Sequence, residues 1–377
     1  MKQINKRNCA VFLLTIIAAL GWISTTHSSI STTQDKALAF IKNVLPIDGT
    51  KYNITLRNYG VPKLPELGLT QPNNVEQEIL TYSLESMDSA LDVICTFSNN
   101  VLTICNMYAV KGQVISDRHY SNLLDAVKSF LEKYQAYSKL DSTEMISMLS
   151  NVDPAKNATI TAGTLKLAVT RQDLSGTWFG DTVDFRWVQT FNGCDYLAVD
   201  LVFRDGVFSN LIDHRQLYSI GDTAVNISKE QAVKIAMDAV KNYSYRMSDD
   251  WEVTGFDVIE EQAVAKLQPQ IRESNVLYPV WSVTLPLNGT WPGSVRELLV
   301  EIWAGSGEVR FVHHQAYGGN DLILDDNSGY ESPAMSSTSP TQENTEALID
   351  PLMIGVISIA AIAIAVATTL LLKKRSK

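Results

Sequence analysis

The feature that most constrains this chain is an uncharged apolar run near its C-terminus, from Leu352 to Leu372 (LMIGVISIAAIAIAVATTLLL). Crossing a hydrocarbon core about 30 Å thick takes about 20 apolar residues, so the run predicts a transmembrane helix at 352–372. A basic cluster at 373–377 (KKRSK) follows directly, and cations beside a span stay in the cytoplasm. The sequence therefore predicts a single-pass protein of the cell membrane, with its N-terminal portion outside and its C-terminus cytoplasmic.

The N-terminus has the layout of a secretory signal. Basic residues precede an apolar core at 9–23, and a stretch rich in serine and threonine follows it. The core is too short to span a bilayer comfortably, so we predict a signal peptide at 1–28. No small-x-small cleavage site stands out, and an uncleaved N-terminal anchor remains the alternative.

The charge of the chain indicates an acidic, solvated exterior portion. Its 377 residues have a net charge of −10, although both ends are basic, so the segment between them is more acidic still. Such a surface repels nucleic acid, which excludes nucleic-acid binding as a function. The 45% hydrophobic content is enough to fill globular cores. Residues 325–350 are instead rich in Ser, Thr and Pro, which predicts a flexible stalk above the membrane.

Three amphipathic helices organise the exterior portion. They are expected at 35–45, near 120–137 and at 228–243, where apolar residues recur every three or four positions. Ser228 and Gln231 have the spacing of a capping box at the start of the third helix. Each helix begins a stretch that continues with several strands. The predicted units are residues 33–115, 116–222 and 223–320.

Alternation of apolar and polar residues predicts the strands that follow each helix. Such strands bury one face and expose the other, as antiparallel sheets do. Asp205 and Gly206 both tolerate positive φ, so they predict a two-residue hairpin turn. Each helix can cover its own sheet. The predicted fold class is therefore α+β, with repeated units of one helix packed on an antiparallel β-sheet, plus the C-terminal transmembrane helix.

Two cysteines lie in neighbouring predicted strands. A three-residue loop at 99–101 would set Cys95 opposite Cys105, within reach of a disulfide, whereas a two-residue loop would put them out of register. We predict the Cys95–Cys105 disulfide, and the alternative is that both are small apolar strand residues. Cys194 is left unpaired, and no C-x-x-C spacing indicates a zinc site.

The third unit resembles a PepSY domain, a small extracytoplasmic module found in propeptides of thermolysin-like peptidases and in many secreted or membrane-bound proteins. The likeness covers residues 223–317. Residues 227–236 (ISKEQAVKIA) resemble the opening helix of that family, and 278–283 (YPVWSV) its middle strand. Residues 300–309 (VEIWAGSGEV) resemble its closing hairpin, which ends in Gly-Glu-Val.

The resemblance implies a helix packed on an antiparallel sheet, in a membrane-anchored cell-surface protein of a prokaryote, bacterial or archaeal. It also implies a role in binding or restraining peptidases or in organising the cell surface, and it implies no catalytic residue. We therefore expect a non-enzymatic extracellular protein that binds or regulates a protein partner such as a secreted peptidase. Two alternatives stay open: an extracellular hydrolase with acidic catalytic residues, and a structural protein of the cell envelope.

The remaining motifs predict no catalytic, metal or cofactor site. Hydrolase, nucleotide-binding and metalloprotease signatures are absent from the sequence. His313 and His314 are adjacent in a predicted strand, so they should point to opposite faces and fail to grip one metal ion. Trp291, Trp303 and Tyr317 are candidate exposed anchors for a partner, and the alternative is that they are core residues, as aromatic residues in strands more often are. Five N-x-S/T sequons are candidate glycosylation sites: Asn53, Asn157, Asn226, Asn242 and Asn288.

Overall fold

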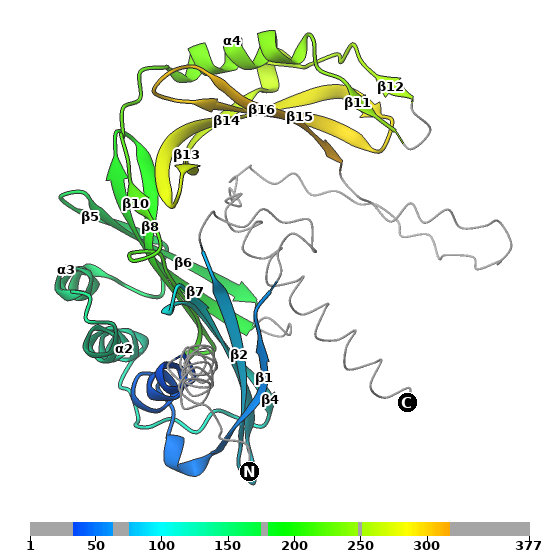
Figure 1. Cartoon of the computed structure of the whole chain (residues 1–377). Coiled ribbons are helices and arrows are strands. Elements are labelled where there is room, and N and C mark those ends of the chain that lie inside the picture. Colours follow the sequence, from blue (N-terminus) through cyan, green and yellow to red (C-terminus); the bar gives the residue numbers. More distant parts are fainter. Residues whose placement is uncertain (1–32, 63–74, 175–179, 248–250, 317–377) are drawn as a thin grey trace, which may run out of the picture. The chain divides into compact units, whose positions relative to one another are not determined.

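The computed structural model of the chain describes residues 33–62, 75–174, 180–247 and 251–316 (Figure 1). All of them belong to the first of two units, Met1–Gly319, and the second unit is Asn320–Lys377. The predicted signal peptide, stalk, transmembrane helix and basic tail lie outside the described residues. Among the residues that are described, no helix is both long and apolar enough to cross a membrane.

Nine antiparallel strands from the first two predicted units form one sheet. Their order is β1-β2-β3-β4-β9-β8-β7-β6-β5, so β4 and β9 join the strands of the first unit to those of the second. The strands are β1 Asn53–Gly60, β2 Gln77–Glu85, β3 Ala90–Ser98, β4 Val101–Lys111, β5 Ala158–Ala162, β6 Leu165–Leu174, β7 Gly180–Phe191, β8 Cys194–Arg204 and β9 Val207–Asp213.

The helices that accompany these strands lie on one face of the sheet (Figure 1). They are residues 33–43, α2 Leu123–Ser138 and α3 Thr143–Met148, with short 3-10 turns η1 Gly49–Lys51 and η3 Leu149–Asn151. Phe40 of the first helix meets α2 directly, since its ring centroid is 6.3 Å from that of Phe130 and 6.1 Å from that of Tyr134. The helices and all the central strands therefore share one hydrophobic core.

The predicted fold class of repeated helix-on-sheet units is therefore wrong. The structure is mostly β, and its largest sheet continues from β4 into β9 through the pairs Ile104–Ile212 and Asn106–Asn210. Pairing β4 with β9 satisfies the backbone hydrogen bonds of two strands that would otherwise lie at the edges of separate sheets. It also lets the helix at 33–43 and α2 cover one larger apolar face. Alternation in the sequence identifies the buried face of a strand but not its neighbours.

The hairpin turns follow the local sequence. Asp205 and Gly206 have φ of 50° and 76°, and Arg204 pairs with Val207 across them, so the predicted two-residue turn is confirmed. Asn99 and Asn100 likewise have positive φ, of 50° and 65°. They form a two-residue turn between β3 and β4, where a three-residue loop was predicted.

The region after β9 contains a five-stranded sheet covered by the helix α4, Lys229–Val240 (Figure 1). The predicted capping box is confirmed, because Ser228 and Gln231 exchange both reciprocal hydrogen bonds. Ala232, Ala236 and Val240 of α4 are buried in the core of this sheet. Its strands are β10 Ser219–Ile220, β13 Val264–Glu273, β14 Val276–Trp291, β15 Val295–Trp303 and β16 Val309–Ala316; β11 Tyr245–Arg246 pairs with β12 Glu252–Val253, and η4 is Glu260–Gln262.

Candidate functional site

The candidate site lies where the chain passes from the large sheet to the five-stranded one. At the end of β9, the backbone N–H of His214 donates to the carbonyl of Ala198 at 3.0 Å. The carbonyl of His214 then accepts from the N–H groups of Leu217 and Tyr218, both at 3.1 Å, which turns the chain. Directly afterwards, β10 pairs in parallel with the start of β14. Residues 214–223, which we call the crossing segment, form one wall of a pocket.

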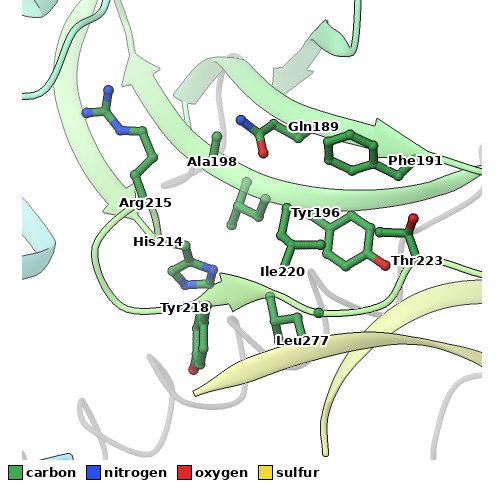
Figure 2. A pocket seen from close by; sticks show the side chains of 12 residues that line it. Gln189, Phe191, Tyr196, Ala198, His214, Arg215, Tyr218, Ile220, Thr223 and Leu277 are labelled. Carbon is green, nitrogen blue, oxygen red and sulfur yellow. The ribbon is translucent and has the colours of Figure 1, made fainter. Parts of the chain in front are cut away.

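The pocket has a volume of about 460 Å³, within the range of roughly 300–1,000 Å³ that is usual for small-ligand sites. Its lining is mainly apolar and aromatic, with a few polar groups (Figure 2). The lining residues are Gln189, Phe191, Tyr196, Leu197, Ala198, His214, Arg215, Tyr218, Ile220, Gly221, Thr223 and Leu277.

Apolar packing between strands of the two sheets holds the pocket together. Cys194 and Tyr196 of β8 form a buried cluster with Leu277 of β14. The crossing segment approaches β14 closely, because a Cβ added at Gly221 would lie only 2.5 Å from the ring of Tyr278. A larger residue at this point would therefore require the ring of Tyr278 to move.

A buried ion pair anchors the base of the crossing segment. The guanidinium of Arg215 donates to the carboxylate of Asp213, with Nη2 to Oδ2 at 2.7 Å and Nε to Oδ1 at 3.0 Å. The hydroxyl of Tyr134, from α2, donates to the same carboxylate at 2.9 Å. Arg215 also donates to the carbonyl of Asp141 and the hydroxyl of Ser142. Its hydrogen-bonding capacity is therefore largely used by the fold.

The histidine in the pocket is neutral at physiological pH. Burial lowers the pKa of His214 to about 4, and the nearby carboxylates of Asp213 and Asp200 oppose that shift without cancelling it. Its ring lies edge-on to the ring of Tyr218, with 5.1 Å between the centroids (Figure 2). The imidazole thus offers the pocket a neutral hydrogen-bonding group and no charge.

Tyr196 contributes its ring to the pocket lining. Its side chain is 2% exposed, and its hydroxyl is buried beside the Cys194 thiol, so the hydroxyl presents no surface to the pocket. Burial also raises the pKa of this phenol and raises that of the neighbouring Cys194 thiol to about 11. The thiol is therefore protonated and unreactive.

The chemistry available in the pocket is set by the residues that line it. None of the residues that line it is Asp or Glu, so two carboxylates do not converge there for acid catalysis of hydrolysis. Arg215 is held by Asp213, and Cys194 is not a thiolate. The pocket therefore combines apolar walls with the polar groups of Gln189, His214 and Thr223 and with the paired cation of Arg215.

The structure places the two predicted disulfide partners directly opposite each other. Cys95 pairs with Cys105 across β3 and β4, although the turn between these strands has two residues. A bulge after Thr96 adds one residue to β4 and so restores the register. Both thiols are fully buried and free in the structure, and burial together with the neighbouring Cys95 raises the pKa of Cys105.

The Cys95–Cys105 disulfide stays a prediction for the protein in an oxidising compartment. We expect mass mapping of an unreduced digest to recover both cysteines in one cross-linked peptide pair. The bond should add only modest stability, since a short loop leaves little chain entropy to remove. Two free thiols in protein isolated without reductant would contradict it. Cys194, which has no cysteine opposite it in its strand pairs, serves as the internal control for free thiol.

All five sequon asparagines are exposed. The side-chain amides of Asn226 and Asn288 donate hydrogen bonds, to the carbonyl of Gly305 and to Asp257. The carbonyl oxygen of Asn157 accepts from the backbone of Arg171. Exposure makes each of the sites Asn53, Asn157, Asn226, Asn242 and Asn288 accessible, and their glycosylation stays a prediction.

The other residues singled out from the sequence have structural partners. The ring of His314 is hydrogen bonded at Nδ1 to the hydroxyl of Tyr243 at 2.9 Å. It also stacks 5.0 Å from the ring of His313, so the prediction that the two side chains point to opposite faces is wrong. The described residues contain no group of three or more His, Cys, Asp or Glu side chains arranged to hold a metal ion. Trp303 is only 7% exposed, so of the two alternatives for this residue the structure supports the core and not an exposed anchor. Trp291 is half-buried, and Tyr317 lies outside the described residues.

The sequence did not reveal the pocket. Its residues come from β7, β8, the crossing segment and β14, which are up to about ninety positions apart and carry no shared motif. The side-chain amide of Asn192 donates to the carbonyl of Thr223 at 2.9 Å, and this contact, which no local pattern indicates, ties the turn between β7 and β8 to the pocket lining.

The neutral state of His214 leads to a pH prediction. An unfolded histidine has a pKa of about 6.5, so between pH 4 and 6.5 the unfolded chain binds a proton that the folded chain excludes. The stability contributed by neutral His214 is therefore fully present above about pH 6.5 and is lost as the pH falls toward 4. Between pH 6.5 and pH 4 we expect the free energy of unfolding to fall by roughly 2 kcal/mol less in His214→Gln than in the wild type. Urea unfolding across that range measures the difference.

The matched control for this measurement is His119→Gln, at an exposed histidine. This variant should keep the pH dependence of the wild type, since His119 is not buried by the fold. Carboxylates that titrate in the same range are present in the wild type and in both variants, so they do not affect the comparison. Identical slopes for the wild type and His214→Gln would show that His214 is not excluded from protonation by the fold.

Comparison with known proteins finds a similar structure but no similar sequence. No protein-family profile and no curated protein matches the sequence. Among solved structures, the chain is similar to the Bacillus megaterium YpeB C-terminal domain, with 11% identity and a TM-score of 0.28. The alignment covers 75% of this chain and 96% of that domain. The similarity is too weak to carry an argument about function.

Proposed function

We propose that this chain is a non-enzymatic protein of the cell surface that binds and regulates a protein partner such as a secreted peptidase. The observation that carries the proposal is the pocket of about 460 Å³ beside the crossing segment. It offers apolar surface and neutral hydrogen-bonding groups, but no carboxylate and no reactive thiolate. Such a site suits recognition of a neutral, partly apolar group.

The region around α4 supports the same proposal. A helix with a capping box packs on an antiparallel sheet there, which is the layout that the PepSY resemblance of residues 223–317 implies. That family includes modules of peptidase propeptides, which makes a peptidase the first partner to test. In this proposal, residues 352–372 anchor the chain in the membrane and hold the rest outside.

The partner is tested by affinity capture of the full-length chain from gently solubilised membranes. We expect a peptidase to be captured, and its activity to change when the chain is added back to the purified enzyme. Ala198→Leu should weaken capture, because Ala198 is 7% exposed and lines the pocket. Ala168→Leu, at a half-buried position outside the lining, is the matched control. Capture without a peptidase, or a captured peptidase whose activity the chain does not alter, would overturn the proposal.

The orientation is tested separately. Protease added to intact cells is expected to remove the bulk of the protein and to spare a small fragment that ends at Lys377. The fragment is identified by mass spectrometry, and the same digestion of permeabilised cells is the control. Protection of the bulk in intact cells would reverse the proposed topology.

A further inference from the structure

We propose that the edge strand β5 joins two copies of this chain, by antiparallel pairing with β5 of the second copy. The inference goes beyond the proposed function, because it concerns self-association and depends on neither the pocket nor a peptidase. Three features of β5 lead to it: its position in the sheet, its self-complementary sequence, and the apolar side chains that it leaves half-buried.

β5 is an open edge of the nine-stranded sheet. It comes last in the strand order, and in the described part of the chain it pairs with β6 alone (Figure 1). The backbone groups on its outer side are therefore available to another strand. Natural edge strands usually prevent such pairing with a charge, a proline or a bulge. β5 is uncharged, has no proline and pairs with β6 without a shift of register.

The other edge strands have such protection. β1, at the opposite end of the nine-stranded sheet, contains Arg57 and a shift of register between Leu56 and Asn58. In the five-stranded sheet, β13 contains Pro269 and β16 contains Arg310. Among the described edge strands of more than two residues, β5 is thus the one that is open to a further strand.

The sequence of β5 is the same in both directions, Ala158-Thr159-Ile160-Thr161-Ala162. In an antiparallel pair centred on Ile160, this residue faces its own counterpart, each Thr159 faces Thr161 of the other copy, and each Ala158 faces Ala162. Such a pair has two-fold symmetry, the commonest symmetry of protein dimers. Threonines that lie opposite each other hydrogen bond across the strands. The sequence of β5 therefore specifies both the partner, a second copy, and the register.

The two faces of β5 suit a sheet that continues into a second copy. Thr159 and Thr161 are exposed, whereas Ala158, Ile160 and Ala162 are half-buried and pack against the core beneath the helices. A two-fold axis perpendicular to the sheet places both copies of Ile160 on the core side, so pairing covers apolar surface that a single chain leaves to water. Five paired residues make a small interface, so we expect a dissociation constant on the order of tens of micromolar.

The first test is disulfide cross-linking of the full-length chain, purified in a mild detergent, at concentrations above that dissociation constant. In Ile160→Cys the introduced thiols face each other with Cβ atoms about 4.5–5.5 Å apart, so mild oxidation should link most chains into dimers that reductant separates. Ile54→Cys, at a half-buried position of the edge strand β1, is the matched control and should stay monomeric. Cys95, Cys105 and Cys194 are buried, so the wild type measures the background.

Charges on the exposed face of β5 test the register. Thr159→Glu/Thr161→Glu sets like charges opposite each other twice, whereas Thr159→Lys/Thr161→Glu sets opposite charges there at the same two exposed positions. Both variants lose the Asn157 sequon, so glycosylation does not distinguish them. We expect the Glu/Glu variant to dimerise roughly tenfold more weakly than the Lys/Glu variant, measured by sedimentation over a series of concentrations.

The possible results separate clearly. Cross-linking of Ile160→Cys but not of Ile54→Cys, together with the expected order of the two charge variants, would support the inference. A monomeric Ile160→Cys, equal cross-linking at both positions, or equal dimerisation of the two charge variants would each overturn it. None of these measurements involves a peptidase, so failure of this inference and failure of the proposed function are distinguishable.

Discussion

Replacing Ala236 by Asp is expected to lower the free energy of unfolding by several kcal/mol, against a total of about 5–15 kcal/mol for a typical domain. Ala236 is fully buried at the centre of α4 and packs in the same cluster as Val283 and Val300 of the sheet beneath. A carboxylate at this position has neither space nor a hydrogen-bond donor, so the helix must move off the sheet or bury an unpaired charge.

The matched control is Lys234→Asp, two residues earlier on the exposed face of the same helix. It introduces the same carboxylate into the same element and should cost under about 1 kcal/mol. Urea unfolding midpoints of the wild type and both variants measure the difference. If the two substitutions were equally harmless, α4 would not be packed through its alanine face.

Replacing Asp213 by Ala is expected to destabilise the fold by about 3–5 kcal/mol. The carboxylate is 4% exposed and binds both the Arg215 guanidinium and the Tyr134 hydroxyl. Its removal leaves a largely buried cation and a buried hydroxyl without their acceptor, and both costs remain in the folded state. Because Tyr134 belongs to α2, the change should also loosen this helix from the end of β9.

An exposed ion pair provides the comparison. Asp238 pairs with Lys241 at 2.7 Å, but both side chains are more than half exposed. Asp238→Ala should therefore change the free energy of unfolding by less than about 0.5 kcal/mol. Thermal or urea unfolding of Asp213→Ala and Asp238→Ala measures the two losses in free energy of unfolding. A loss at Asp213 no larger than the loss at Asp238 would show that the buried pair does not anchor the crossing segment.

The sequence by itself determined most of the local structure. Capping-box spacing and helical periodicity located α4, and Asp205-Gly206 located a hairpin, because these signals depend on backbone geometry within a few residues. Alternation with a period of two also indicated that the strands bury one face and expose the other, because successive side chains of a strand point to opposite sides. The predicted span at 352–372 rests on the sequence alone.

Only the tertiary structure decided which strands are neighbours and what they enclose. β4 joins β9 across about a hundred residues, a choice made by burial of one shared core and not by any local pattern. A bulge brought Cys95 opposite Cys105 where turn length predicted a mismatch. The pocket depends on the same long-range packing: its walls come from β7, β8, β10 and β14, and they meet only because Leu277 packs on Cys194 and Tyr196, far from it in the sequence.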